Sequence, residues 1–417
     1  MQEIILSVRF AWKSITANGL RTLLTLSGII IGTVAVFSVL SLGDGLKRFV
    51  NGQIESFGSD IIQTEVKVPS TDKNSTANAT GLAQGIQITT LTQDDGKAVA
   101  KLPNVVAWYG GSIGQELATH EDTTKRVMLF GAGWQAPVVD QGTKITEGNF
   151  YTEEEDMSAA NVAVLGSGVR KTFFPDQPAV GQTIKIKDQS YRVIGVLAER
   201  GSTGFVSFDD FIYIPVTTLQ KKVLGVDYVA MLMSKVADMS KAESTAEDIR
   251  MLLRDRHDIT DPKNDDFAVT TIAEAKKTVE TVFNAVQILL TALASISLCV
   301  SGVGILNVMF VAVAERTTEI GLRKAVGARD KDILRQFLLE AAGVALLGGL
   351  IGLILAIVLV WGAFTVVQSM GIKVGFALAW GNVVFSLGFA LVAGLVFGVY
   401  PAWKASKISP LQAIRSE

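Results

Sequence analysis

The chain has 417 residues, of which 49% are hydrophobic and 19% charged, and its formal net charge is −2. This composition is too apolar for an ordinary soluble protein and too charged for a protein lying wholly in lipid. The net charge alone indicates no acidic or nucleic-acid partner, and we expect no nucleic-acid partner. The distribution of the apolar residues must therefore indicate the fold class.

Residues 1–20 predict a short amphipathic helix on the cytoplasmic membrane surface, because apolar side chains recur there at helical spacing. A plain first turn of the following helix remains an alternative. The apolar stripe consists of Ile4, Ile5, Val8, Trp12 and Ile15, with Arg9 and Lys13 beside it.

Four segments are long and apolar enough to cross a bilayer, which takes roughly 20 residues of helix. The first could be a cleaved signal peptide, but its apolar run exceeds the roughly 7–15 residues typical of one, and a retained anchor is predicted. The sequence thus predicts a multi-pass α-helical membrane protein with four transmembrane helices. We place them at 21–43, within 281–314, at 338–368 and at 383–403.

Residues 44–280 predict a large α+β extracytoplasmic domain inserted between the first and second transmembrane helices. Helices are expected at 92–101, where Thr92 and Asp95 form a capping-box pattern, and at 240–256. A hairpin is expected to turn at 187–190, and residues 70–86 read as a mobile loop. By resemblance to the family introduced below, the domain has two lobes. Strands are predicted at 61–68, 104–109, 125–130, 161–165, 183–187, 191–197, 211–214 and 228–233.

The uncharged segment 281–314 would be about 50 Å long as one helix, which is longer than a bilayer is thick. Its first turns contain Asn284 and Gln287, which are costly at the centre of a membrane. We therefore expect a stalk that continues into the second transmembrane helix.

Residues 315–337 form a densely charged loop between two apolar helices. Ion pairs between Glu319 and Arg323, and between Arg316 and Glu319, are expected along a short helix in water. Gly327 marks the end of this helix, and a second helix starts after it. Ile320, Leu322, Ala325 and Val326 add apolar surface, which favours a docking element over a plain hinge.

Lysine and arginine cluster before the first span, in the charged loop and in the tail 404–417, whereas the link 369–382 carries only Lys373. The positive-inside rule then places the charged loop and both termini in the cytoplasm. We expect a multi-pass protein of the bacterial cytoplasmic membrane, in contact with the lipid bilayer.

Four stretches carry a family resemblance that covers nearly the whole chain. The charged loop, the start of the chain ("NGLRTLLTLSGIIIGTVAVFSVLSLGDG") and its end ("YPAWKASKISPLQAIR") resemble MacB/FtsX-type ABC transporter permeases. The middle stretch, "NVAVLGSGVRKTFFPDQPAVGQTIKIKDQSYRVIGVLAERG" followed by "DDFIYIP", is similar to the extracytoplasmic domain of the same family. The resemblance implies a coupling helix that docks an ATPase, a dimer with a second copy or paralogue, and an extracytoplasmic adaptor. Its docking residues would be Glu315, Arg316, Glu319, Ile320, Gly321, Arg323, Lys324 and Gly327.

The 417 residues contain no recognisable catalytic motif. No G-x-x-x-x-G-K-[ST] loop occurs, so ATP and Mg²⁺ are expected to bind a separate ABC ATPase subunit. His120 and His257 lack metal-ligand spacing and read as surface or loop histidines, and the acidic run 153–156 reads as a solvated loop. Cys299 reads as a small apolar filler within the second span. We expect no cofactor, no metal and no enzyme activity in this chain.

Two classes of function follow. The first is an export permease that couples ATP hydrolysis by its partner to extracytoplasmic movement, driving out peptides, drugs or lipid-linked cargo. This mechanotransmission fits spans with no ionisable residue at likely bilayer depth. The alternatives are a non-transporting regulator of a cell-wall enzyme or sensor, a lipoprotein-releasing permease, and a structural anchor.

Overall fold

The computed structural model describes residues 19–56, 58–200, 207–369, 375, 377–410 and 413. The amphipathic helix expected at 1–20 falls outside them, except for its last two residues. The chain divides into two compact units. We call them the helical unit (1–48, 281–370 and 374–417) and the core domain (49–280 with 371–373).

The core domain is built on one mixed sheet of 10 strands in the order β10-β1-β9-β2-β3-β8-β5-β7-β4, with β6 paired to β2 and β7. The pairs β3–β8 and β5–β7 are parallel and the others antiparallel. All eight predicted strands are present, whereas β4 and β10 were not predicted. The strands are β1 (Ile61–Val66), β2 (Val105–His120), β3 (Thr123–Ala132), β4 (Ile145–Gly148), β5 (Val162–Leu165), β6 (Thr183–Ile186), β7 (Gln189–Leu197), β8 (Phe211–Pro215), β9 (Met231–Val236) and β10 (Phe267–Thr271).

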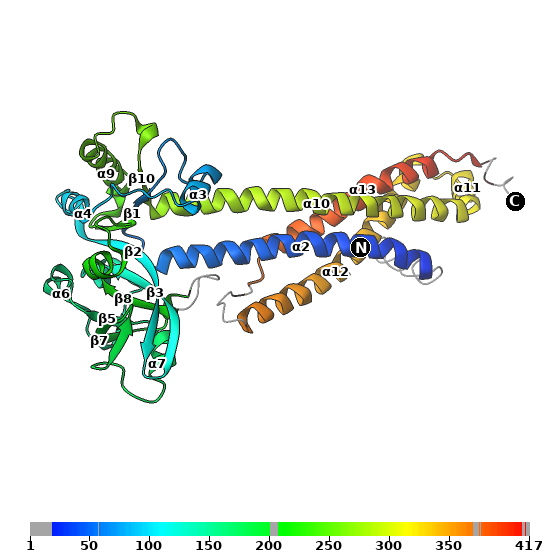
Figure 1. Ribbon diagram of the computed structural model, residues 1–417. Coiled ribbons are helices and arrows are strands. Elements are labelled where there is room, and N and C mark those ends of the chain that lie inside the picture. Colours follow the sequence, from blue (N-terminus) through cyan, green and yellow to red (C-terminus); the bar gives the residue numbers. More distant parts are fainter. Residues whose placement is uncertain are drawn as a thin grey trace. The chain divides into compact units, whose positions relative to one another are not determined.

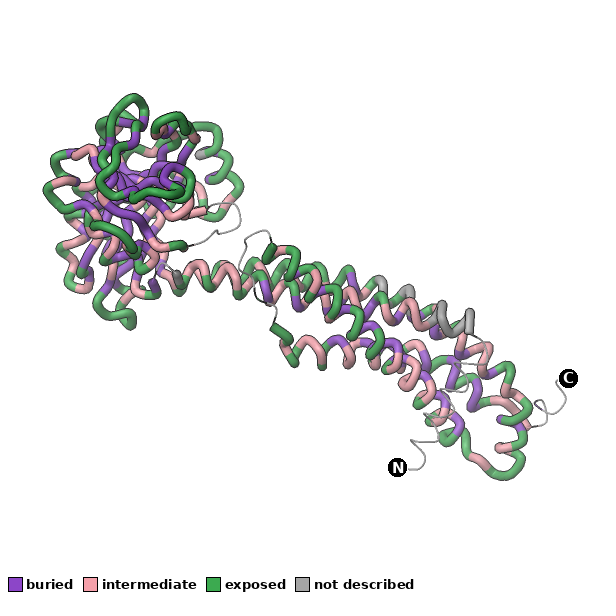
Figure 2. The backbone as a smooth tube through the Cα atoms, turned by 90° about the horizontal axis from the view of Figure 1, so that it is seen from below, coloured by how far each residue is buried: buried purple, intermediate pink, exposed green. Residues whose placement is uncertain are grey.

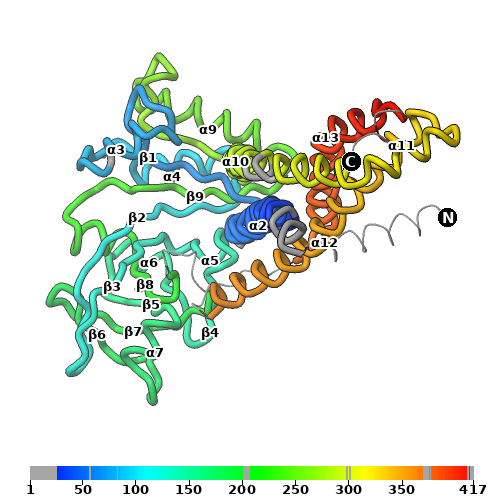
Figure 3. The backbone as a smooth tube through the Cα atoms, turned by 90° about the vertical axis from the view of Figure 1, so that its right-hand side faces the viewer, coloured from blue at the N-terminus to red at the C-terminus, as the bar shows by residue number. Residues whose placement is uncertain are grey.

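Strand β2 is much longer than the predicted 104–109 and joins two parts of the sheet (Figure 3). Its first half pairs with β9, and its second half pairs with β3 and β6. After its first residues, β2 contains the segment "GGSIG" at 110–114. The three glycines of this segment have low strand propensity. Pairing on both edges overrides that local preference.

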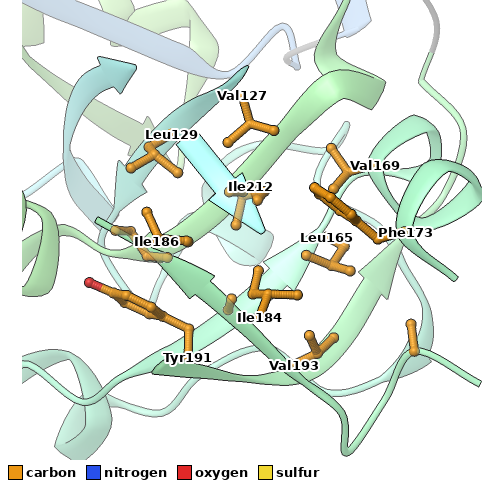
Figure 4. Close-up of a cluster of buried hydrophobic side chains, with 14 of the residues drawn as sticks. Val127, Leu129, Leu165, Val169, Phe173, Ile184, Ile186, Tyr191, Val193 and Ile212 are labelled. Carbon is orange, nitrogen blue, oxygen red and sulfur yellow. The ribbon is translucent and has the colours of Figure 1, made fainter. Parts of the chain in front are cut away.

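The largest cluster of buried side chains in the core domain lies between α7 and the strands β3 and β5–β8 (Figure 4). Leu165, Ile184, Val193 and Ile212 are all fully buried there. The short strands β5 and β8 are buried along their whole length, as expected for strands covered on both faces.

Short helices cover the sheet. The capping box predicted at Thr92 is confirmed, since the Thr92 N–H donates to Asp95 Oδ2 over 2.8 Å. The predicted helix at 240–256 is also confirmed as α9. The helices are α3 (Thr76–Ala83), α4 (Gln93–Val99), α5 (Ala136–Val139), α6 (Glu153–Met157), α7 (Ser167–Phe173), α8 (Val216–Thr218) and α9 (Ala242–Arg256).

Two predictions for loops of the core domain were wrong. Residues 70–86 contain the helix α3, and Asn78 within it is buried, where its Oδ1 accepts from the Val68 N–H over 2.9 Å. The acidic run 153–156 begins α6, capped by Thr152, and its Asp156 is buried. Asp156 Oδ2 accepts from the Trp134 N–H over 3.1 Å. In both cases side chains satisfy backbone donors of distant segments, which local composition does not reveal.

The predicted hairpin of β6 and β7 is confirmed, with Ile186 opposite Gln189. Lys187 and Asp188 form its two-residue turn and have φ of 48° and 63°. Positive φ at both central residues is the geometry of a type I′ turn, which matches the twist of the flanking strands.

A buried charge cluster joins α4, α9 and β10. The imidazole of His257 is 4% exposed, so it is not a surface histidine, although it lies in the turn that follows α9, as the alternative of a loop histidine predicted. His257 Nδ1 lies 2.9 Å from Asp266 Oδ1, and its Nε2 lies 3.5 Å from Asp95 Oδ2. The hydrogen bond to Asp266 and the nearby Asp95 carboxylate raise the pKa of His257 to about 9, although burial opposes this. The histidine is therefore a permanent cation at neutral pH.

The raised pKa makes the local stability of the core domain depend on pH. The stabilisation from charged His257 is complete below its unfolded pKa of about 6.5 and is lost as the pH rises through about 9. We expect the free energy of local opening at α9 and β10 to fall by about 2–3 kcal/mol as the pH rises over this range. Hydrogen exchange, corrected for intrinsic rates, measures this free energy. A flat profile would show that His257 is neutral in the folded protein.

The helical unit contains four long apolar helices and one short helix (Figure 1). The core domain lies between the first and second of them in the sequence, which confirms the predicted fold class. The segments able to span a bilayer by length and composition are 26–55, 272–296, 330–369 and 380–406, with 302–315 as a shorter apolar piece. The helices are α2 (Gly19–Ser56), α10 (Ile272–Glu315), α11 (Thr317–Ala325), α12 (Asp330–Ser369) and α13 (Trp380–Ser406).

Helices α12 and α13 pack closely through small residues. A Cβ built on Gly394 would lie 2.3 Å from Ala345 Cβ, and one on Gly398 would lie 2.6 Å from Ala341 Cβ. Small residues at i and i+4 on both helices let the backbones approach, as in membrane helix pairs generally.

Exposed residues run along the helices of the helical unit (Figure 2), and many of them are large apolar side chains. Such surface is expected where lipid replaces water. Cys299 is exposed on α10, so its prediction as a packed filler was wrong. Other exposed apolar side chains include Ile288, Leu293, Ile296, Ile354, Val358, Leu359, Val384 and Val396.

Candidate partner-docking site

The charged loop folds as the short helix α11 between α10 and α12. Glu319 lies in its first turn and Arg323 and Lys324 in its last, which complements the helix dipole. Gly327, at φ +105°, ends it as predicted, and the Ala328 N–H donates to the Arg323 carbonyl over 3.0 Å. The start of α12 is capped by Asp332, whose Oδ2 accepts from the Arg329 N–H over 3.1 Å.

One face of α11 is buried inside the helical unit. Ile320 is 2% exposed and joins a cluster with Val313, Phe337 and Ala402 from α10, α12 and α13. Gly321 faces the tail, where an added Cβ would lie 2.3 Å from Ala413 Cβ. These two predicted docking residues therefore hold α11 in place and face away from solvent.

Lys324 fixes α11 to the C-terminal end of α13. Its side chain is 10% exposed and forms an ion pair with Asp330 over 2.8 Å. Its ammonium also donates to the Ser406 and Ile408 carbonyls over 2.5 and 3.1 Å. An ammonium can donate three hydrogen bonds, and these three acceptors use that capacity.

The arginines of the loop bind α12. Arg323 donates to Gln336 over 2.6 Å and pairs with Glu319 over 2.5 Å, which confirms the predicted i,i+4 pair. The predicted pair of Arg316 with Glu319 was wrong, since Arg316 pairs with Glu340 over 3.2 Å. Arg316 precedes the first turn of α11 and has φ −108° and ψ 14°, so helical i,i+3 spacing does not apply to it.

The opposite face of α11 is open. Leu322 is 63% exposed and Val326 is 85% exposed, and they lie four residues apart on one side of the helix. Exposed Glu315, Glu319 and Arg329 flank them. Leu322 and Val326 were predicted as apolar surface but not as docking residues. The signal was present in their spacing, since Ile320 and Leu322 cannot share one face of a helix.

The composition of this surface suits binding and not catalysis. An apolar pair with a charged rim on a rigid helix resembles the centre of a protein interface. Within the ranges that the structure describes, no group of three or more histidine, cysteine, aspartate or glutamate side chains could hold a metal ion.

The fold defines a class of protein, a membrane protein with four apolar helices and an α+β domain inserted between the first and the second. Residues 22–252 match the MacB-like periplasmic core domain, and residues 291–410 match the FtsX-like permease C-terminal domain. The chain belongs to the MacB/FtsX-type permease family and is a membrane protein.

Curated relatives match along the whole chain. It is 34% identical over 418 residues to the macrolide export ATP-binding/permease protein MacB of Azoarcus sp. strain BH72, covering 100% of this chain and 60% of that protein. It is 34% identical over 420 residues to the pyoverdine export ATP-binding/permease protein PvdT of Pseudomonas entomophila, again covering 100% and 60%. The chain thus spans about 60% of the length of these relatives.

A solved structure also aligns with part of the chain. The periplasmic region of MacB from Actinobacillus actinomycetemcomitans aligns with a TM-score of 0.46 and 20% identity, covering 54% of this chain and 95% of that one.

Proposed function

We propose that this chain is the permease subunit of an ABC-type exporter and that α11 docks a separate ATPase subunit. One observation carries the proposal: Leu322 and Val326 are exposed on a helix whose other face is fixed to α12 and to the tail by Ile320, Gly321 and Lys324. A force applied to such a helix moves its neighbours instead of bending a loop.

Orientation follows from charge. Lysine and arginine gather in the segment before α2, in and after α11, and in the tail, and the positive-inside rule places these parts in the cytoplasm. The ATPase, with its ATP and Mg²⁺, would then meet α11 in the cytoplasm of a bacterial cell, while the core domain lies outside the cytoplasmic membrane.

Helix α10 offers a mechanical route. It runs without a break from Ile272, directly after β10, to Glu315, two residues before α11. We propose that closure of the ATPase on ATP moves α11, and that α10 passes this movement to the core domain. The work is then done on cargo outside the membrane, with a second permease copy or paralogue and an adaptor as partners. The cargo class is a peptide, a drug or a lipid-linked molecule.

Copurification with the ABC ATPases of the host tests the docking surface. We expect wild-type protein to capture one ATPase and Leu322→Glu or Val326→Glu to weaken capture by about 30-fold or more, as for central interface residues. A charge placed in an apolar contact would be desolvated without a partner.

Met251→Glu is the matched control, because Met251 is 55% exposed on α9 of the core domain, and it should leave capture unchanged. If both α11 variants retained the ATPase at wild-type levels, docking through this face would be wrong. If no ATPase were captured by wild type, the permease proposal itself would fail.

A further inference from the structure

The core domain contains a cavity of about 490 Å³ that the exporter mechanism does not use. It lies among the end of β1, the segment before α3, α9, β10 and the first turns of α10. Cavities of roughly 300–1,000 Å³ are the usual size for small-molecule sites. Its chemistry decides what it could bind.

The charged residues lining the cavity are mostly basic. Four basic residues, Lys67, Lys73, Arg250 and Arg254, line it together with two acidic residues, Asp265 and Glu274. Three of the basic side chains already have carboxylate partners. Lys73 pairs with Glu65 over 2.5 Å, Arg250 with Glu274 over 3.1 Å, and Arg254 with Asp265 over 2.8 Å.

Lys67 differs from the other three. The residue is only 8% exposed, and in the part of the chain that the structure describes its ammonium makes neither an ion pair nor a hydrogen bond. Its backbone N–H donates to the Asp266 carbonyl over 2.8 Å, which fixes the residue just after β1. The ammonium itself is not fully buried, although the rest of the residue is largely covered, so it remains accessible to a ligand. A ligand that supplies a negative charge would satisfy it.

The remaining wall is apolar. Phe267 and Val269 of β10 are 2% and 6% exposed, and Ile54, Ala275 and Val279 also line the cavity. A phosphate dianion needs several free donors, whereas one ammonium beside apolar carbons suits a monoanion with an apolar body. We propose that this cavity binds a small organic carboxylate and that Lys67 binds its carboxylate group.

A second cavity of the same domain provides a contrast. It measures about 710 Å³ and is lined by four acidic residues, Asp94, Glu153, Asp156 and Asp227, with Lys97 and Lys221 as its two basic ones. Its excess of negative charge disfavours an anion. Lys221 therefore provides a matched control, as a lysine that lines a cavity of the opposite charge balance in the same domain.

The test uses the full chain in nanodiscs of zwitterionic lipid, with empty nanodiscs as the blank. The probe is 4-fluorobenzoate, followed by ¹⁹F line broadening, and the neutral comparison is 4-fluorobenzyl alcohol. We expect benzoate binding that Lys67→Met weakens about tenfold or more, since hydrogen bonds to charged groups carry that much affinity. Lys221→Met should bind as wild type does.

Four results would overturn the proposal: no broadening above the blank, equal binding of the neutral alcohol, equal binding by Lys67→Met, or complete displacement by an equal concentration of inorganic phosphate. The melting temperature of Lys67→Met without probe should match or exceed that of wild type, because the substitution removes no ion pair among the described residues. A lower melting temperature would reveal a protein partner for Lys67 and also count against a ligand. If Lys67→Met did not fold, Lys67→Gln would take its place with the same expected loss. ATPase capture is measured separately, so failure here leaves the exporter proposal unaffected.

Discussion

Gly394→Leu should disrupt the helical unit. Its Cβ alone would lie 2.3 Å from Ala345 Cβ and 3.3 Å from the Ala341 carbonyl oxygen, so α12 and α13 must separate to admit a leucine. Overpacking of this kind costs on the order of 3–5 kcal/mol when backbones have to move. We expect a large fall in the monodisperse fraction of detergent-solubilised protein after mild heating.

Gly388→Leu is the matched control on the same helix, because nothing lies within 4 Å of a Cβ built on Gly388. It should behave as wild type, and leucine should even favour the helix slightly over glycine. Equal loss in both variants would mean that leucine harms α13 by itself and that the contact with α12 is not the cause.

Asp95→Ala should cause the largest loss of stability in the core domain. The Asp95 carboxylate is 4% exposed, lies 2.6 Å from Arg256 Nε and 3.5 Å from His257 Nε2, and also caps α4. Burial would raise the pKa of Asp95, but hydrogen bonds with His257 and Arg256 hold it well below its usual range. In Asp95→Ala, charged His257 loses one of its two carboxylate neighbours. Loss of one partner from a buried ion pair lowers the free energy of unfolding by about 3–5 kcal/mol.

Hydrogen exchange at α4 and α9 in the full chain measures this loss. Asp94→Ala is the control, since Asp94 is the neighbouring residue of the same helix and its pair with Lys97 is 73% and 63% exposed. Exposed pairs of this kind contribute at most about 1 kcal/mol. Similar exchange in the two variants would contradict the role assigned to the buried cluster.

Local sequence patterns were sufficient to predict two features of the candidate site. The Glu319–Arg323 pair and the stop at Gly327 were predicted because each depends on residues within one or two turns. The partner of Arg316 was predicted wrongly because Glu340 lies 24 residues away on α12. The inward direction of Ile320, Gly321 and Lys324 depends likewise on α12, α13 and the tail.

In the core domain, too, the burial of polar groups depends on residues outside the local sequence. His257 and Asp156 have no neighbours in the sequence that predict burial, and both are buried against elements distant in the chain. Residues 70–86 looked like a mobile loop because they are small and polar, yet Asn78 binds the backbone of Val68 and Lys73 and supports α3. Hydrogen bonds to distant backbone groups have no signature in local composition.

The sequence by itself determined the four apolar helices, the inserted α+β domain and most strands, because long apolar runs, period-two alternation and capping motifs are properties of contiguous residues. The family followed from the resemblance of short motifs, which are likewise contiguous. Only the tertiary structure decided which residues of α11 face solvent, that His257 is a buried cation, and that Lys67 lines a cavity without a partner. Burial and ion pairing depend on side chains brought together from distant segments, and no local pattern encodes those contacts.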